Sequence, residues 1–359
     1  MKCDFLIIGG GIAGASAAAR LSELGQVVLL EMEEALGYHA SGRSAAMFEE
    51  NYGSPAVVAL NKASAEYHHS ANGGYLTPRG LMLISGPDQE AQFRDDVKEL
   101  GLAEISSAEA QALVPILNPK TVTLAGLHQA AQDLDTDRMV QDFAKVARSN
   151  GGQVITRAKV TAIHHDATGW QVEAGGETYA AKQLVNAAGA WVDEIAALAS
   201  VAPIGIQPKR RSMARLPAPG GHDVTKWPML MGVGESWYAK PDAGKLLVSP
   251  ADADLVAPHD AYADDMVLAE GLARYEEMVT TPVTRVESNW AGLRSFSPDG
   301  ALVLGPDPEQ PDFIWCAAQG GYGFQTAPAA SRLLADILGG HSSELDAGSR
   351  AALSPERLR

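Results

Sequence analysis

Cysteine and basic residues are both scarce in this chain of 359 residues. The two cysteines, Cys3 and Cys316, stand at opposite ends of the sequence, which excludes the disulfide framework that stabilises small secreted domains. Lysine and arginine together number 28 against 44 aspartates and glutamates, so the formal net charge is -16. Because such a protein repels polyanions, we expect neither a nucleic acid nor an anionic membrane surface as its partner.

Long hydrophobic runs are also missing from the sequence. No apolar stretch approaches the roughly 20 residues that cross a bilayer, so we expect no transmembrane segment. Residues 1–4 lead straight into the first apolar run without a basic segment or a cleavage site, which favours a reducing cytoplasm as the location. The nine histidines are scattered or directly adjacent, as in His68-His69, and this spacing predicts no metal site. A small molecule is the partner that these absences leave.

The clearest motif stands at the beginning of the sequence. The apolar run Phe5–Ile8 breaks into the glycine-rich segment 9–14, an alanine-rich stretch follows, and a second apolar run, Val27–Leu30, ends on Glu31. A strand, a glycine turn, a helix and a terminal acid in this order match the fingerprint of dinucleotide binding. The motif predicts that the ADP half of a dinucleotide binds here, and it leaves the choice between NAD and FAD open.

Each residue of this motif has a physical role. Gly9 allows the tight turn, Gly11 lets the backbone approach a pyrophosphate, and Gly14 lets the helix lie close to the sheet. The positive N-terminal end of the helix stabilises the phosphates, while the Glu31 carboxylate can accept hydrogen bonds from ribose hydroxyls. The alternative is a glycine turn that is kept only for packing.

A second glycine-rich junction lies near the end of the chain. The apolar run Phe313–Ala318 predicts a core strand, and the segment Gln319–Thr326 leads into a helix with Pro328 near its first turn and Gly339-Gly340 at its end. A second helix N-terminus facing the same ligand favours a flavin, because the reduced ring carries negative charge at its N1–C2=O edge. A glycine loop kept for packing is again the alternative.

The segments between these junctions predict the rest of the fold. With 46% hydrophobic residues the chain can bury two cores, so two domains are expected. A helix is expected over Pro55–Ser70, and an amphipathic helix with Asp137 as its N-cap. The run Leu184–Trp191 is typical of a strand buried on both faces, and Pro203–Val283 alternates like the short strands of an antiparallel sheet. Further strands are expected at Tyr75–Pro78, Gly80–Ile84, Val154–Ile155, Lys159–His165 and Gly169–Glu173.

Taken together, the motifs are similar to those of one known family. The segments are Gly9–Gly14 with Glu31, Asn186–Trp191, Trp290–Arg294 and Gln319–Gly323. They resemble the FAD-dependent D-amino acid oxidase family, which includes glycine oxidase and sarcosine oxidase, and the resemblance covers nearly the whole chain. Within that family the bacterial D-arginine dehydrogenases are most similar, through Gly37–Ala46, Gln207–Ser212 and Tyr238–Gly244.

The resemblance implies a mixed α/β fold, with a Rossmann-like FAD-binding domain and a substrate domain built on a mixed, largely antiparallel sheet. The FAD-binding domain would be discontinuous, with segments 1–77, 139–200 and 286–359, and the substrate-binding domain would comprise 78–138 and 201–285. Non-covalent FAD is expected, because the segment Gly292–Phe296 has no cysteine. The matching cofactor-binding residues are Gly9, Gly11, Ile12, Ala13, Gly14, Glu31, Ser41, Arg43, Ser44, Ala45, Ala46, Val160, Ala188, Gly189, Trp191, Arg294, Gly320, Gly321, Tyr322, Gly323, Phe324 and Gln325.

The same resemblance assigns the substrate contacts. Arg211 and Arg294 match the two arginines that hold the substrate carboxylate. Elementary chemistry agrees for Arg294, because a guanidinium in an apolar segment needs an anion to offset its desolvation. Tyr52 and Tyr238 match tyrosines that line the pocket, and Gly321 matches a residue whose carbonyl accepts from the substrate amine. The side-chain pocket would be formed by Met47, Glu49, Leu81, Met229, Met231 and Gln325.

Departures from the D-arginine dehydrogenase pattern bear on specificity. Leu81 stands where that relative has the glutamate that pairs with a substrate guanidinium, Met47 replaces a histidine and Met231 replaces a valine. Glu49 stands where the relative has threonine. If Glu49 points into the pocket, basic D-amino acids are expected as substrates. If it is solvated, the pocket suits the side chains of Leu, Met or Phe.

The expected reaction is oxidative deamination of a D-amino acid, with hydride transfer from Cα to flavin N5 and an amino acid and an electron acceptor as partners. The acceptor would be dioxygen or a quinone-like carrier. A water held by Tyr52 or Tyr238 is the expected proton acceptor. The alternatives are an amine oxidase or dehydrogenase for glycine, sarcosine or a D-imino acid, a non-catalytic flavoprotein subunit and, more distantly, a nicotinamide dehydrogenase.

Overall fold

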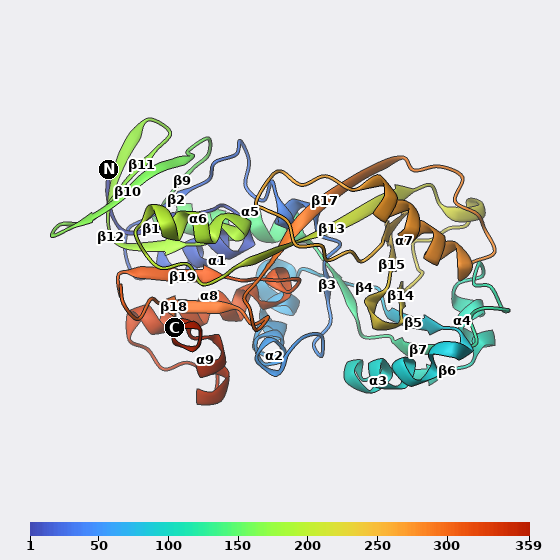
Figure 1. Ribbon diagram of the computed structural model, residues 1–359. Coiled ribbons are helices and arrows are strands. Elements are labelled where there is room, and N and C mark those ends of the chain that lie inside the picture. The colour runs from blue at the N-terminus through green and yellow to red at the C-terminus, as the bar shows by residue number, and fades with distance from the viewer.

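Two eight-stranded sheets organise the chain, and the computed structural model describes all residues 1–359. Each sheet forms the centre of one lobe, and both chain ends lie in the lobe of the first sheet (Figure 1). The first sheet contains β1 (Lys2–Ile8), β2 (Val27–Leu30), β9 (Gln153–Ile155), β10 (Val160–Asp166), β11 (Gly169–Ala174), β12 (Glu177–Asn186), β18 (Val303–Pro306) and β19 (Phe313–Ala317). The second sheet contains β5 (Leu81–Ser85), β6 (Ala103–Ile105), β7 (Leu124–His128), β13 (Gln207–Leu216), β14 (Met229–Gly232), β15 (Tyr238–Asp242), β16 (Lys245–Ser249) and β17 (Ser288–Phe296).

A small third sheet and nine α-helices complete the fold. The third sheet consists of β3 (Met47–Phe48), β4 (Leu76–Pro78) and β8 (Gln132–Leu134). The helices are α1 (Ile12–Leu21), α2 (Pro55–Ser70), α3 (Glu90–Leu100), α4 (Ser107–Leu113), α5 (Thr136–Ser149), α6 (Val192–Leu198), α7 (Asp265–Glu277), α8 (Gly323–Gly339) and α9 (Ala347–Leu353). None of them combines the length and apolarity that a membrane-spanning helix needs.

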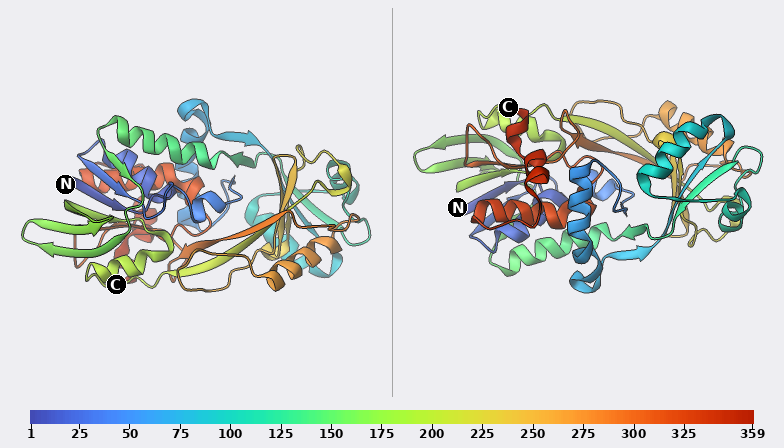
Figure 2. Two further views of the ribbon diagram at one scale, coloured as in Figure 1. Left: turned by 90° about the horizontal axis from the view of Figure 1, so that it is seen from above. Right: turned by 90° about the horizontal axis from the view of Figure 1, so that it is seen from below.

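The first sheet has a parallel core, as the buried apolar runs predict. β1 pairs in parallel with β12 on one side and with β2 on the other, so that Ile8 lies between Asn186 and Leu30 where the three strands end together. Both faces are covered, which is why these strands are apolar throughout. Leu6 packs with β10, β11 and α6, while its neighbour Ile7 packs on the opposite face with α1, α2 and α8. Figure 2 shows these layers from above and below.

The second sheet is antiparallel except for the parallel pair β14–β5, so the predicted mixed, largely antiparallel sheet is present. Its order is β17-β13-β16-β15-β14-β5-β7-β6. β17 lies in this sheet although residues 286–359 are predicted to belong to the FAD-binding domain. The domain boundaries therefore stay a prediction. The predicted boundary assigns β17 to the FAD-binding domain, whereas this strand pairs within the second sheet.

Several local predictions need correction. The N-cap of α5 is Asp135, which accepts from the backbone N–H of Arg138 at 3.2 Å, whereas Asp137 lies in the first turn. The stretch predicted as antiparallel strands also contains the helix α7, which is capped by Asp264. This helix was not predicted, because the hydrophobic periodicity of its sequence is weak. Tyr75–Pro78 contributes β4 to the third sheet instead of the second, and Pro328 lies beyond the first turn of α8.

The glycine turn after β1 depends on contacts that no side chain would permit. Gly9 has a φ of 107°, and a Cβ there would lie 2.4 Å from the carbonyl oxygen of Ala187 at the end of β12. At Gly14 a Cβ would lie 1.8 Å from the carbonyl oxygen of Gly9. The close approach of α1 to the turn is therefore possible only with glycine at this position.

Replacement of Gly14 by alanine should destabilise the protein by about 1–3 kcal/mol, because the added methyl must push α1 away from the turn. Thermal unfolding of the apoprotein, followed by circular dichroism, measures this effect. Gly11→Ala is the matched control, since its Cβ would meet only the Ser41 Oγ at 3.1 Å. Equal melting temperatures for the two variants would contradict the packing role of Gly14.

Both thiols should be inert in the folded protein. Burial raises the pKa of Cys316 to about 12, and burial together with the Asp4 carboxylate raises the pKa of Cys3 to about 11. Since only the thiolate reacts, both side chains stay protonated and unreactive at pH 8. Mass spectrometry after treatment with iodoacetamide should show two alkylated cysteines in guanidinium chloride and none under native conditions. Rapid native labelling of Cys316 would contradict this burial.

Candidate active site

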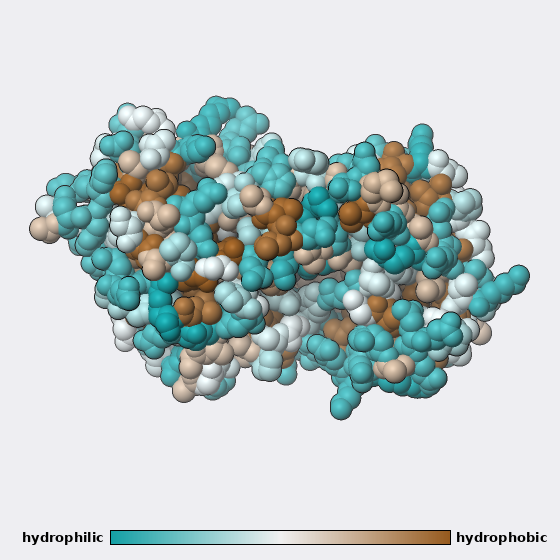
Figure 3. Space-filling model, in the orientation of Figure 1, coloured by the Kyte–Doolittle hydropathy of each residue, from teal (hydrophilic) through white to brown (hydrophobic).

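A cavity of about 470 Å³ lies along the junction of the two lobes, where Figure 3 shows a waist in the molecular surface. One end is bounded by the turn between β1 and α1 and by the end of β2. The other end is bounded by side chains of β5, β13, β14, β15 and β17. Segments that are far apart in the sequence therefore meet around one elongated space.

The first end of the cavity has the features that a dinucleotide requires. Glu31 is 7% exposed and accepts hydrogen bonds from the backbone N–H groups of Gly10, at 2.7 Å, and Glu33, at 2.8 Å. Each carboxylate oxygen keeps a further lone pair that a ribose hydroxyl can use. At the N-terminus of α1, the backbone N–H of Ile12 donates to the Ser41 Oγ at 3.0 Å. These contacts hold the acid and the loop beside the helix end that attracts phosphate.

Arg43 has a more specific role than its assignment as a cofactor residue suggests. It lines the cavity, but its Nη1 donates to the carbonyl oxygens of Ala261 and Ala291, each at 2.9 Å. Its Nη2 forms an ion pair with Asp260 at 2.5 Å. Most of the hydrogen-bonding capacity of the guanidinium is thus used to tie the loop 37–46 to β17 and to the segment before α7.

Nearly all of the other predicted cofactor residues line the cavity. They are Gly9, Gly11, Ile12, Ala13, Glu31, Ser41, Ser44, Ala45, Ala46, Val160, Ala188, Gly189, Trp191, Arg294, Gly320, Gly321, Gly323, Phe324 and Gln325. Gly14 and Tyr322 do not line it. Gly14 packs against the turn, and the Tyr322 ring lies 5.3 Å from the Tyr52 ring, so both support residues that do reach the cavity.

The second glycine junction closes the middle of the cavity. Residues 317–321 line it at the end of β19, and α8 then begins at Gly323 with its N-terminus toward the same space. Ala318 and Gly320 have φ values of 57° and 53°, and this tight turn brings the backbone to the cavity wall. Two helix N-termini along one elongated cavity fit a long cofactor with a pyrophosphate at one end and an electron-rich ring at the other.

Two arginines without counter-ions dominate the far end of the cavity. Arg211 on β13 and Arg294 on β17 come from adjacent strands, in which Arg211 pairs with Gly292. Both line the cavity, and neither has a carboxylate within ion-pair distance in the structure. The buried Nε of Arg294 has no hydrogen-bond partner at all. A half-buried guanidinium whose buried Nε has no partner favours an anionic ligand.

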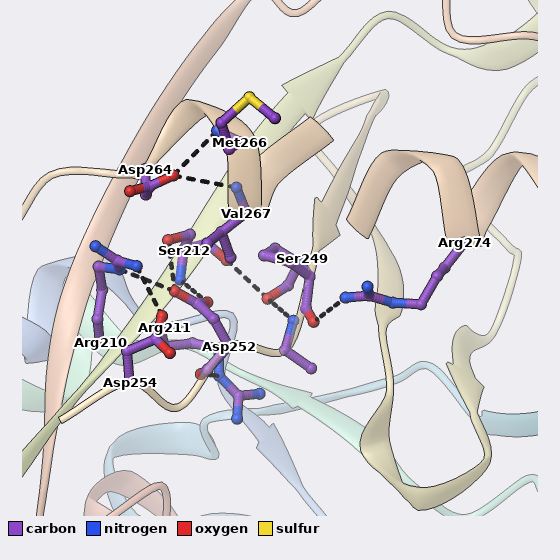
Figure 4. A network of polar contacts seen from close by, with 12 residues as sticks. Arg210, Arg211, Ser212, Ser249, Asp252, Asp254, Asp264, Met266, Val267 and Arg274 are labelled. Carbon is purple, nitrogen blue, oxygen red and sulfur yellow. Dashed lines mark hydrogen bonds and ion pairs between the residues drawn. The ribbon is translucent and has the colours of Figure 1, made fainter. Parts of the chain in front are cut away.

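In the polar network around Asp252, the neighbouring residues Arg210 and Arg211 have different partners (Figure 4). Arg210 forms ion pairs with Asp252, at 3.1 Å, and Asp254, at 2.7 Å. The Asp252 carboxylate also accepts from the backbone N–H of Ser212 at 2.6 Å, and its carbonyl oxygen accepts from the Arg211 Nε at 2.9 Å. Arg210 is therefore neutralised within the protein, whereas Arg211 is held in place with its remaining N–H groups free.

The two predicted tyrosines lie beside these arginines. The Arg211 guanidinium is 5.8 Å from the centre of the Tyr238 ring, a cation–π distance. Burial, reinforced by the nearby Glu235 carboxylate, raises the pKa of Tyr52 well above its ordinary value. The Tyr52 phenol therefore stays protonated, so it can donate a hydrogen bond but is not itself a base.

The predicted side-chain pocket is largely apolar. Leu81 and Met231 are buried, Met47 and Met229 are half-buried, and all four line the cavity. They belong to one hydrophobic cluster, in which the sequence analysis missed Leu100 at the end of α3. Apart from Glu49, these positions offer contact with hydrocarbon and no charge.

The position of Glu49 contradicts the branch of the sequence prediction in which this residue is solvated. Glu49 lines the cavity and is only 5% exposed, so it is not a solvated loop charge. Its Oε2, however, is 2.5 Å from the Nδ1 of His128 on β7, so it is not an isolated acid either. The sequence analysis missed His128, because the pair joins positions 79 residues apart.

Glu235 is a second acidic residue that the sequence analysis missed. It lies between β14 and β15 and lines the cavity near Tyr52. It adopts a φ of 52° after Gly234, whose N–H donates to Asp96 on α3 at 2.7 Å. A glycine followed by an acid in a short turn was the only available signal in the sequence.

Comparison with known proteins identifies the family. Residues 4–337 match the DAO family model, described as FAD dependent oxidoreductase. The chain is 24% identical over 361 residues to the glycine oxidase of Geobacillus kaustophilus, which covers 94% of this chain and 93% of that protein. It is 23% identical over 375 residues to the N-methyl-L-tryptophan oxidase of Citrobacter koseri, with 96% and 97% covered.

Solved structures share the fold. The L-α-glycerophosphate oxidase of Mycoplasma pneumoniae, solved in a dithionite-reduced form with FAD bound, gives a TM-score of 0.85 at 20% identity, covering 94% of this chain and 95% of that one. The crystal structure of glycine oxidase from Geobacillus kaustophilus gives 0.81 at 21% identity, with 96% of each chain covered. These similarities confirm the mixed α/β fold. With its glycine turn, its second helix N-terminus and a family match over nearly its whole length, this chain belongs to the DAO family of FAD-dependent oxidoreductases.

Proposed function

We propose that this protein oxidises D-amino acids to imino acids, which water then hydrolyses to 2-oxo acids and ammonia. The observation that carries the proposal is the pair of guanidiniums, Arg211 and Arg294, that face one cavity from adjacent strands without a counter-ion. An α-amino acid supplies the missing anion as its carboxylate. The D configuration is supported by the similarity of the motifs around these residues to D-arginine dehydrogenases.

The residues of the site would act mainly by positioning the substrate. Arg211 and Arg294 would hold the carboxylate, and the carbonyl oxygen of Gly321 would accept from the amine. Tyr52 and Tyr238, which stand beside these arginines, would limit the orientations of the bound substrate. FAD, held non-covalently through the glycine turn and Glu31, supplies the acceptor for the hydride from Cα. Dioxygen or a quinone-like carrier would be the final electron acceptor.

The pocket walls favour a neutral, apolar substrate side chain. Met47, Leu81, Met229 and Met231 would contact a side chain such as that of Leu, Met or Phe. Leu81 stands where the D-arginine dehydrogenases have the glutamate that pairs with a substrate guanidinium. The Glu49 carboxylate is already paired with His128. Glycine or sarcosine would leave this apolar surface without a contact, so the related small amines are the weaker candidates.

The proposal is tested by anaerobic mixing of the yellow holoprotein with candidate substrates. We expect D-Leu, D-Met and D-Phe to bleach the flavin absorbance faster than D-Arg, D-Lys, glycine or sarcosine. Glycerol 3-phosphate belongs in the panel, because an oxidase of glycerophosphate shares the fold. Bleaching by glycerol 3-phosphate alone, or by no amino acid of either hand, would refute the proposal.

Arg294→Ala should lower kcat/KM for every amino acid by at least about a hundredfold, because one charge-assisted contact to the carboxylate is lost. Steady-state kinetics with an artificial acceptor measures the effect. Arg285→Ala is the control, since that side chain is 69% exposed and pairs with Glu287. Wild-type kinetics for Arg294→Ala would contradict the assignment of Arg294 to binding of the substrate carboxylate.

Leu81→Glu should shift the preference toward D-Arg and D-Lys by roughly ten- to a hundredfold relative to D-Leu. A carboxylate in this buried position gains most when a cationic side chain offsets its desolvation. The ratio of kcat/KM values for D-Arg and D-Leu measures the shift. Leu81→Gln has the same size without the charge and should leave the ratio near that of the wild type. An unchanged ratio in Leu81→Glu would show that substrate side chains do not reach this wall.

A further inference from the structure

The proposed function gives no chemical role to the Glu49–His128 pair, although Glu49 lines the cavity beside the apolar pocket. The Glu49 Oε2 lies 2.5 Å from the His128 Nδ1, and the Oε1 accepts from the backbone N–H of Asn51 at 3.2 Å. The Glu49 side chain is 6% exposed, whereas that of His128 is 26% exposed. The pair therefore joins the cavity wall to a partly solvated imidazole.

The position of this pair beside the pocket carries a cost in desolvation free energy. The adjacent cavity wall consists of methionine and leucine side chains, and a carboxylate loses hydration there. A hydrocarbon residue at position 49 would continue that wall without such a cost. A few polar groups in an otherwise apolar cleft are characteristic of binding and catalytic sites.

The backbone of Glu49 lies close to the start of α8, which follows the loop where a substrate amine is expected. The Glu49 backbone N–H donates to the Oε1 of Gln325 at 3.4 Å, and the Nε2 of Gln325 donates to the Tyr52 carbonyl oxygen at 3.4 Å. Gln325 lies in the first turn of α8, just after Gly321, which is proposed to accept from the amine. The Tyr52 phenol is held protonated and cannot take a proton. The cavity-lining carboxylates of Glu49 and Glu235 remain as candidate acceptors, and Glu49 is the one that is paired with an imidazole.

We propose that Glu49, oriented by His128, removes a proton from the ammonium group of the bound substrate. This inference rests on the proposed oxidation of amino acids. One N–H bond of the ammonium breaks, its electron pair remains on nitrogen, and an O–H bond forms on the Glu49 carboxylate. The freed electron pair then forms the C=N bond as the hydride leaves Cα for FAD. The proton then passes from the Glu49 carboxyl to the Nδ1 of a neutral His128 that carries its own proton on Nε2, and the resulting imidazolium releases one proton to water.

The other charged groups near the pair are already neutralised or lie across the pocket. Asp133 on β8, next to β3, pairs with Arg79 and with Lys240, at 2.7 and 2.9 Å. Arg294 and Glu235 face the pocket from β17 and from the turn before β15. Leu81 lies opposite His128 in the strand register, and it is apolar. The pair is thus a titratable unit of the cavity wall whose two members have no other ion-pair partner.

The decisive experiment is the pH dependence of kcat/KM for Glu49→Gln, measured on the flavin-loaded enzyme between pH 6 and 10. General-base catalysis contributes roughly 10²–10⁴-fold, so we expect a loss of this size at pH 7. The loss should shrink to a few-fold near pH 10, where the substrate amine is neutral without help. Glu50→Gln is the control, because Glu50 is the exposed neighbour and should keep the wild-type profile.

His128→Asn separates orientation from chemistry. If His128 is a positioning residue, His128→Asn should lower kcat/KM less than Glu49→Gln does. High pH should again restore the rate. A loss that is equal at every pH in both variants would indicate a purely structural pair and would overturn the proposal. A loss confined to D-Arg and D-Lys would assign Glu49 to side-chain recognition instead, which also overturns it.

A binding measurement gives a readout that does not depend on turnover. α-Methylleucine has no hydrogen on Cα and cannot be oxidised, so calorimetry can report its Kd for the holoprotein at each pH. We expect a nearly flat Kd in the wild type, which binds the ammonium form. In Glu49→Gln the Kd should fall about tenfold per pH unit below the amine pKa, because only the neutral amine binds well. A flat Kd in Glu49→Gln would overturn the proposal.

The two proposals fail in different ways. If no amino acid reduces the flavin at any pH, the proposed function fails and the role of Glu49 fails with it. If amino acids reduce the flavin and Glu49→Gln follows the wild-type pH profile, the oxidation stands and only the proton transfer is wrong.

Discussion

The site depends on two guanidiniums that the protein leaves without a counter-ion. The antiparallel pairing of β13 with β17 places Arg211 and Arg294 together at the junction of the lobes. Asp252 and Asp254 neutralise Arg210 and keep its charge away from the cavity, so the local positive charge is concentrated on the residues that face a ligand. An anionic ligand would offset the desolvation of these guanidiniums, which is why we propose that this sheet binds the substrate carboxylate.

The first lobe provides a second constraint, because it contains the residues that would hold the nucleotide end of FAD. The turn at Gly9 and the buried Glu31 line the cavity in this lobe. The N-terminus of α8 meets the same cavity farther along, beside Arg294. A cofactor held in this way would extend toward the second lobe, which we propose selects the substrate. The loop that Arg43 ties to β17 joins the two lobes along this path.

Local chemistry made much of this predictable from the sequence. The glycine turn, the helix Pro55–Ser70 and the second glycine junction depend on neighbouring residues, and all three are present. Features that depend on distant pairing were missed. The sequence around Glu49 cannot reveal that His128 lies against it. The hydrophobic periodicity of α7 is too weak to distinguish this helix from the strands around it. The family resemblance supplied the site residues, whereas the neighbours that tune them required the fold.

A structure of the holoprotein with a bound carboxylate ligand, such as α-methylleucine, tests the central claim most directly. The measured quantities are the distances from the carboxylate oxygens to the guanidinium nitrogens of Arg211 and Arg294. The account predicts that both arginines donate hydrogen bonds to the carboxylate, with the side chain of the ligand against Leu81 and Met231. A carboxylate bound elsewhere, with Arg294 paired to Glu235 instead, would contradict it.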